Sequence, residues 1–354
     1  MLRYFQKTTV FRTADPNRRG RVPDGGGRCY TCDMAELQNS HIRGPLTREL
    51  DDPRSPVRAF LDQRFASGLR AIQNRYREEA PESLVVPSGS ANAGTVGTAA
   101  DWLMRFLLTR GPNLTLPTAG ARRCDQAGLV LTPALQQLAD MLDLTVPEQP
   151  VKALPFDGPA EGHCGEPELL ARACWVLALL TEPVRAGVQA AILGPLGQFK
   201  NAQPGMEDLL ALASPDALEQ LAGFREVFEE VLMPNLADRH GPWVIGPTFQ
   251  GSGLVGGADA DLIASGLLLD VKTTAKKLSL ARVDVFQLLA YTLLDFENAY
   301  SLDSVGLFSA RYGYMVIWNF RELLEELSGR PVDLPALREE FREMLLAAQP
   351  KRPA

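Results

Sequence analysis

Two short apolar runs bordered by acidic residues constrain the fold of this chain more than any other feature. They lie in GGADADLIASGLLLDVKTT, residues 256–274, on either side of Ser265 and Gly266. Glycine suits the positive φ angle that a two-residue hairpin turn needs, so the segment predicts two antiparallel strands. A buried charge is costly unless it is paired or binds a metal, so acidic residues beside buried strands require an explanation.

The register of this hairpin predicts where the acidic residues lie. With a two-residue turn, Asp261 is opposite Asp270, and Asp259 is opposite Lys272. Because side chains alternate between the two faces of a strand, these four residues project from one face, and neighbouring leucines fill the other. A three-residue turn would shift the register by one residue and weaken this alignment.

Such a face favours a metal site. Two carboxylates directly opposite each other repel, and a divalent cation between them removes the repulsion. A small number of hard oxygen ligands suits Mg²⁺, with Mn²⁺ as a substitute, and leaves room for water and a phosphate. A lysine beside the metal can orient a water molecule or stabilise negative charge in a transition state. The alternative is a surface hairpin with solvated acidic residues, which is the usual meaning of a lone Asp-x-Lys.

The rest of the chain predicts an α/β protein whose first half is largely helical. Apolar residues recur at helical spacing in the first half, and the period changes to that of short strands from about residue 243. The predicted helices span 55–81, 96–111, 132–146, 166–187 and 215–237. The predicted second half has strands over 243–249, 254–263 and 267–274, a helix over 279–299, a strand pair joined near Arg311–Gly313, and helices to the end.

We divide the chain into a flexible basic arm (1–35), a mainly helical region (36–210) and a strand-containing core with C-terminal helices (211–354). One domain with helices around a single sheet is an equal alternative. The net charge of -7 disfavours a protein that binds nucleic acid through bulk positive charge. The first 30 residues, however, carry seven basic residues against two acidic ones, so this arm can contact phosphate or remain a solvated tail.

The remaining composition bears on compartment and cofactors. No apolar run is long enough to span a membrane, and the first residues lack the apolar centre of a secretory signal, so we expect a cytoplasmic protein with reduced thiols. Cys29 and Cys32 have a zinc-like spacing, but no second pair of this kind follows, so we do not expect zinc. The chain has no phosphate-binding G-x-x-x-x-G-K-[ST] loop, so any motor would be a separate ATPase or helicase subunit.

Together, GADADLI, LLDVKTT and QLLAY, the last of these on the helix that follows the hairpin, resemble the PD-(D/E)XK nuclease superfamily, in particular its RecB-like and phage-exonuclease-like branches. The resemblance covers about residues 243–320. It implies a restriction-endonuclease-like fold, with a mixed central sheet flanked by helices in residues 211–354. It also implies that the chain is an enzyme.

The resemblance assigns roles to individual residues. Asp261 matches the first metal ligand, with Asp259 as its rival, and Asp270 matches the second. Val271 would contribute its backbone carbonyl, and Lys272 matches the catalytic lysine. Gln287 and Tyr291, four residues apart on one helix, match residues that steady the site and contact the DNA backbone.

Two further positions are less well defined by the resemblance. The family often adds an acidic residue from a helix before the sheet, for which Glu229 is preferred over Glu226 and Glu230. In RecB-like nucleases a glycine is followed one turn later by a histidine, whereas Gly97 is followed here by Asp101. Asp101 would replace the histidine as an oxygen ligand or take a surface or capping role instead.

The resemblance implies a Mg²⁺-dependent nuclease that hydrolyses DNA phosphodiester bonds in bacterial phage defence or DNA repair. An iron–sulfur cluster is not expected, because all five cysteines precede residue 175 and none follows the nuclease motifs. The alternative is a nucleic-acid-binding or assembly module of a multi-subunit defence complex that does not cleave. A small-molecule hydrolase or a zinc-stapled scaffold is a third, weaker interpretation.

Overall fold

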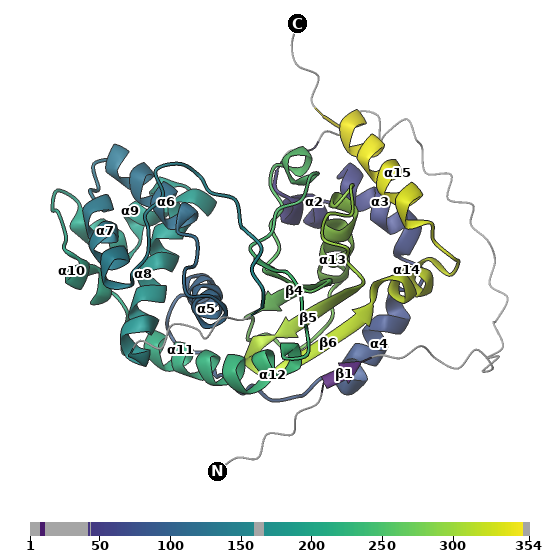
Figure 1. The fold of residues 1–354 in the computed structure, drawn as a ribbon, viewed down its shortest axis with the longest axis horizontal. Helices are drawn as coiled ribbons and strands as arrows, with labels where there is room; N and C mark the ends of the chain where they lie inside the picture. The colour runs from purple at the N-terminus through teal and green to yellow at the C-terminus, as the bar shows by residue number, and fades with distance from the viewer. Residues whose placement is uncertain (1–7, 11–41, 43, 159–165, 350–354) are drawn as a thin grey trace, which may run out of the picture.

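A computed structural model describes residues 8–10, 42, 44–158 and 166–349 of the chain. Its centre is a mixed six-stranded sheet with the order β1-β6-β5-β4-β3-β2, so the predicted α/β class is confirmed (Figure 1). β1 pairs in parallel with β6, and β4 with β5, whereas the other neighbours are antiparallel. The strands are β1 (Thr8–Val10), β2 (Trp243–Ile245), β3 (Leu262–Ala264), β4 (Leu267–Lys272), β5 (Ser304–Ser309) and β6 (Tyr314–Asn319). Apart from β1, the predicted basic arm lies outside the described residues.

The two faces of the sheet belong to two different hydrophobic cores. Leu262 and Leu269 belong to the first core, whereas Ile263 and Leu268 belong to the second. This alternation follows from the opposite orientation of successive side chains along a strand. β3 and β4 are therefore buried on both faces, which explains their nearly continuous apolar sequences.

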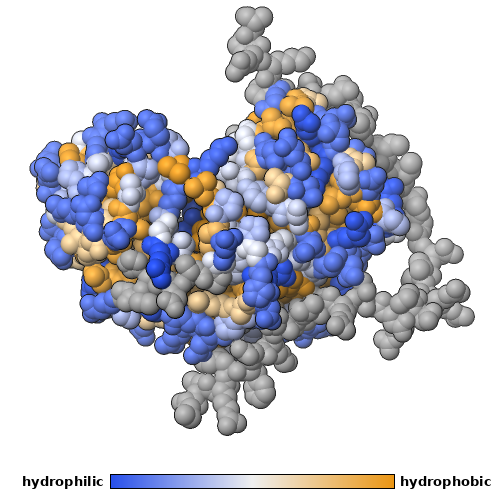
Figure 2. All heavy atoms as spheres, in the orientation of Figure 1, coloured by the Kyte–Doolittle hydropathy of each residue, from blue (hydrophilic) through white to orange (hydrophobic). Residues whose placement is uncertain are grey.

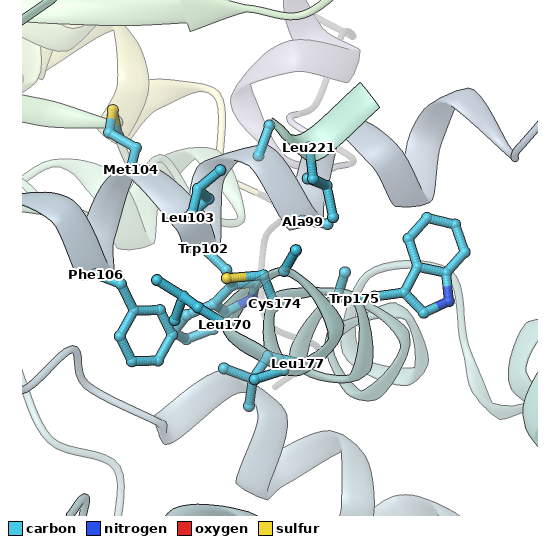
Figure 3. Packing of buried hydrophobic residues seen from close by; sticks show 14 of the residues in the cluster. Ala99, Trp102, Leu103, Met104, Phe106, Leu170, Cys174, Trp175, Leu177 and Leu221 are labelled. Atoms are coloured by element: carbon cyan, nitrogen blue, oxygen red, sulfur yellow. The ribbon is translucent and has the colours of Figure 1, made fainter. Parts of the chain in front are cut away.

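Helices from the middle of the chain form the first core. They are α5 (Ala93–Leu108), α6 (Thr115–Gln126), α7 (Thr132–Met141), α8 (Pro167–Arg185), α9 (Val188–Leu193), α10 (Met206–Leu210), α11 (Pro215–Val227) and α12 (Met233–Leu236). Figure 3 shows Leu170 and Cys174 of α8 packed beside Trp102 and Leu103 of α5. Although α8 is apolar on most sides, no helix in the described part of the chain is both long and apolar enough to cross a membrane.

Helices from both ends of the described chain cover the second face. They are α2 (Leu46–Asp51), α3 (Pro56–Phe65), α4 (Leu69–Glu79), α13 (Arg282–Leu294), α14 (Phe320–Ser328) and α15 (Leu334–Ala347). Arg64 pairs with Glu340 at 2.8 Å, and Asp62 pairs with Arg282 at 2.8 Å. Residues 46–79 thus pack with the C-terminal elements and not with the helices that directly follow them (Figure 1).

Several predicted elements are shorter in the structure, and two differ in kind. The helix predicted over 55–81 is divided at Gly68, where a Cβ atom would lie 2.2 Å from the carbonyl oxygen of Glu326, so the close approach of α14 requires glycine. The strand predicted over 254–263 is wrong in its first part. Gly256 and Gly257 have φ angles of 63° and 119°, which end a short 3-10 turn, and β3 begins only at residue 262.

Candidate functional site

The predicted hairpin turn is present and has the predicted register. Ser265 and Gly266 both adopt positive φ angles, 46° and 82°, as a two-residue turn of the type favoured in hairpins requires. Leu262 of β3 pairs with Leu269 of β4, as a two-residue turn demands. The two leucines lie in the first core, so the acidic residues next to them face the second core and α13.

Asp261 and Asp270 lie where the β3–β4 ladder ends. Asp270 is buried, with 4% of its surface exposed, and Asp261 accepts a hydrogen bond at Oδ2 from the backbone N–H of Val271, at 2.6 Å. Burial raises the pKa of the Asp261 carboxyl well above its usual value, and the negative charges of Asp270 and Asp101 raise it further. Like charges in a poorly solvated site repel each other, and a bound cation relieves such repulsion.

Lys272 is the cation closest to these carboxylates. Its Nζ lies 2.9 Å from Oδ2 of Asp270 and 3.6 Å from Oδ1 of Asp284, and it donates a hydrogen bond of 2.9 Å to Oε1 of Gln287. Burial lowers the pKa of Lys272, but Asp270 and Asp284 outweigh this effect, so the pKa is raised above its usual value. The ammonium therefore stays charged at neutral pH.

Two predicted α13 residues connect Lys272 to the loop before β3. Gln287 donates from Nε2 to the hydroxyl of Tyr291 at 2.7 Å, and this hydroxyl donates to the backbone carbonyl of Asp259 at 2.8 Å. The chain of hydrogen bonds runs from β4 through one face of α13, as the spacing of four residues predicts. These bonds fix the ammonium group of Lys272 relative to the end of the hairpin.

Asp259 contributes its backbone to this network, and its side chain is exposed. It forms an isolated antiparallel bridge with Thr248 and lies outside the β3–β4 ladder. Asp261 is thus the residue opposite Asp270, whereas Asp259 lies on the more solvated side of the site. The structure favours Asp261 over its rival as the partner of Asp270.

Helix α5 brings a third carboxylate to the site. A Cβ atom on Gly97 would lie 2.6 Å from Oγ1 of Thr273, so α5 approaches the end of β4 closely at a glycine. One turn further on, Asp101 pairs through Oδ2 with Nε of Arg105 at 2.9 Å. Its Oδ1 is buried and has no hydrogen-bond partner within the described residues. The charge of Asp101 also acts on Asp261.

The preferred upstream acid, Glu229, is not brought to the hairpin. Its side chain is exposed on the π-helical turn at Phe228–Leu232 and pairs with Arg225 at 2.8 Å. Glu226 and Glu230 are also exposed. Asp101, four residues after Gly97, is therefore the acid from a preceding helix that the structure places beside Asp261.

Sequence reasoning missed Asp284 and Arg311. Asp284 lies three residues before Gln287, so its helical spacing was a usable signal. Arg311 is 2% exposed and donates to the backbone carbonyl of Thr273 at 2.7 Å and to Oε1 of Gln220 at 2.6 Å. Arg311 thus connects the end of β4 to α11. In the sequence, the only indication of this role is that an arginine stands between two apolar strands.

The described acidic residues do not form a complete set of metal ligands. Within the described residues, no three His, Cys, Asp or Glu side chains converge tightly enough to hold a metal ion. Asp270 Oδ2 and Asp101 Oδ1 nevertheless both lack a hydrogen-bond partner there, although the former lies close to Lys272. Two or three neighbouring carboxylates fit Mg²⁺, which keeps several of its own waters in protein sites.

The two cysteines that the structure describes lie in the helices of the first core. Cys124 and Cys174 are buried free thiols in α6 and α8. Burial raises the pKa of Cys124 to about 11, and burial also raises the pKa of Cys174. The Cys29 and Cys32 pair and Cys164 lie outside the described residues.

Comparisons of the chain with protein-family models, curated proteins and solved structures find no match.

Proposed function

We propose that this chain is a metal-dependent nuclease with a restriction-endonuclease-like fold, and that it hydrolyses phosphodiester bonds in DNA. The proposal rests on one observation above all. Asp261 and Asp270 lie side by side at the end of a hairpin, with Lys272 paired to Asp270 and fixed by Gln287. A fold needs no such cluster for stability, because buried carboxylates of like charge cost free energy.

Asp261 and Asp270 would hold Mg²⁺ or Mn²⁺, with the carbonyl of Val271 as a further oxygen donor. Asp101 is our candidate for a third carboxylate, because its Oδ1 is buried without a partner within the described residues. The bound metal would lower the pKa of a coordinated water and offset negative charge on the phosphate.

Lys272 would stabilise the negative charge that develops on the phosphate oxygens. Its ammonium carries a full charge at neutral pH and lies against the buried Asp270, near the half-buried Asp261. Gln287 holds Nζ in place, and Tyr291 holds Gln287, so the cation is positioned before substrate binds. A preorganised cation needs no rearrangement during the reaction, which is the main source of electrostatic catalysis.

The direct test is incubation of the pure protein with linear and circular DNA, both single- and double-stranded. Each substrate is tested with Mg²⁺, with Mn²⁺ and with EDTA. We expect cleavage with either metal and none in EDTA, and cutting of the circles would show that no free end is required. DNA that is bound but never cut by the wild type would support the second candidate, a binding module. The open arrangement of the acidic residues is the observation that favours that candidate.

A further inference from the structure

A cavity of about 480 Å³ adjoins the acidic cluster on the side of α5. Its walls are the C-terminal end of α5 with the turn that follows, residues 143–147, residues 151–156, and Ile245 of β2. Figure 2 shows the molecule hollowed between its helical lobe and the lobe that contains the sheet, with hydrophobic side chains along the rim. The volume lies in the range of pockets that hold one small molecule.

The segment that closes the cavity, residues 147–156, is held in place along its length. Asn113 donates from Nδ2 to the carbonyl of Val151 at 2.8 Å, and Oγ1 of Thr115 accepts from the N–H of Val151 at 3.1 Å. At the far end, Phe156 and Trp243 exchange two backbone hydrogen bonds, of 2.9 and 2.8 Å. The cavity is therefore preformed and does not depend on a ligand for its shape.

One wall of the cavity is cationic. Arg105 is tied through Nε to Asp101, and its two terminal nitrogens have no hydrogen-bond partner in the described part of the chain. Lys152 of the closing segment also lines the cavity and is exposed, and Asp143 is the one acidic residue among the lining residues. A planar guanidinium with two free N–H₂ groups is suited to phosphate oxygens.

The other wall is apolar. It contains the half-buried Phe156 and Ile245, together with Val151 and Leu154, which are 50% and 74% exposed. Apolar side chains that gather around a cavity with a few polar groups are typical of ligand-binding pockets. A nucleobase could lie with one face against these apolar side chains and keep its polar edge in contact with water.

Both walls are connected directly to the acidic cluster. Ile245 pairs with Leu262, the residue after Asp261, and the N–H of Gly246 donates to the carbonyl of Asp261 at 3.0 Å. A Cβ atom on Gly246 would lie 3.0 Å from a terminal nitrogen of Arg105. Arg105, which lines the cavity and pairs with Asp101, is the side chain that connects the cavity to the carboxylates, and a nucleotide next to the one at the aspartates would lie along this connection.

We propose that the cavity binds one unpaired nucleotide of the substrate strand. The base would lie against Phe156 and Leu154, and its phosphate would contact Arg105 and Lys152. A base in a duplex can enter such a cavity only after it is unpaired and unstacked, which costs free energy, so the preferred substrate is a single strand or an unpaired end. This inference rests on the proposed nuclease function, because it names the kind of DNA that the same site receives.

The test measures DNA binding in EDTA, where no cleavage occurs. The probes are a labelled oligodeoxythymidine and a blunt hairpin duplex, and the variant is Lys152→Glu with Leu154→Asp. Both residues are exposed, so the fold is preserved. The matched control is Lys200→Glu with Leu193→Asp, which makes the same chemical changes at exposed positions outside the cavity.

We expect the wild type to prefer the single strand, and the cavity variant to bind it at least about tenfold more weakly, as loss of one stacked base and a phosphate contact implies. The control should bind like the wild type. Equal affinity for strand and duplex, no DNA binding by the wild type, or equal affinities of the two variants would overturn the proposal.

Cleavage is measured separately on the same proteins with Mg²⁺. If the wild type cuts DNA with Mg²⁺ and the cavity variant binds DNA as well as the wild type, the cavity proposal is wrong and the nuclease proposal stands. If the cavity variant binds DNA more weakly but the wild type cuts none of the substrates, the nuclease proposal is wrong and the nucleotide site stands. The two proposals therefore fail in different ways.

Discussion

Asp261 Oδ2 accepts a hydrogen bond of 2.6 Å from the backbone N–H of Val271. The bond joins the two strands just beyond the point where their ladder ends, and it holds one carboxylate oxygen against the backbone. The orientation of Asp261 toward Asp270 is therefore set by the backbone of β4. The Asp261 side chain therefore has two roles that can be tested separately: its oxygen accepts a hydrogen bond from the backbone, and its negative charge acts on Asp270.

Asp261→Asn tests that separation. The amide oxygen of asparagine can still accept from Val271, while the charge that repels Asp270 and Asp101 is lost. We expect the free energy of unfolding in EDTA to stay the same or rise by about 1 kcal/mol, because a buried charge is removed. Urea unfolding measures this change. A loss of several kcal/mol would contradict a mainly electrostatic role for the carboxylate.

The pair formed by Lys272 and Asp270 is expected to show strong coupling. Lys272→Met leaves the nearly buried Asp270 carboxylate without its cation, and we expect a loss of about 2 kcal/mol. Adding Asp270→Asn removes the orphaned charge and should restore most of the stability. Urea unfolding of the two single variants and the double variant gives the coupling free energy. Simple additivity of the two changes would show that the ion pair contributes nothing.

The loop after β4 presents two more cations near the site. The carbonyl of Lys276 accepts a hydrogen bond from the hydroxyl of Tyr312 at 3.1 Å, and Leu278 is buried, so the loop is anchored while the ammonium groups of Lys276 and Lys277 are exposed. If both contact phosphates of a single strand, replacing them with alanine should reduce the slope of log K against log salt by about 1.4.

Binding titrations at several salt concentrations in EDTA measure this slope. Lys200→Ala with Arg330→Ala, which removes two exposed cations elsewhere, is the matched control. A parallel shift in affinity without a change in slope would mean that the loop lysines do not touch phosphate.

Stability should fall in alkaline solution. Burial raises the pKa of Cys124 from 9.0 to about 11, so the folded protein keeps a proton that the unfolded chain releases earlier. The stabilisation is fully present below about pH 8.5 and is lost as the pH rises toward 11. Urea unfolding at pH 8.5, 9.5 and 10.5 should show a shallower decline for Cys124→Ala than for the wild type. Parallel curves would exclude a contribution from this thiol.

The hairpin could be predicted from the sequence because its turn and register depend on residues that are close together in the chain. Ser265 and Gly266 set the turn, the turn sets the register, and the register places Asp261 opposite Asp270. The α13 pair of Gln287 and Tyr291 was readable for a similar reason, since helical spacing puts both on one face.

The rest of the site depends on tertiary packing that no local pattern encodes. Asp101 reaches Asp261 because α5 crosses the end of β4 at Gly97, and the sequence alone did not choose between that role and a surface one. Glu229 is also an acidic residue on a helix that precedes the sheet, but it is exposed and pairs with Arg225. The division of the helix at Gly68 likewise reflects contact with α14, more than 250 residues away in the sequence.

The most direct measurement is metal-dependent DNA cleavage by the wild type, Asp270→Asn and Lys272→Met, beside Glu229→Gln as a matched control. Glu229 is an exposed acid paired with Arg225, so its loss should leave the hairpin intact. We expect the wild type and Glu229→Gln to cut equally with Mg²⁺, and the two hairpin variants to lose at least about 100-fold in rate while remaining folded. Cleavage that survives both hairpin substitutions would contradict the assignment of the active site to Asp270 and Lys272.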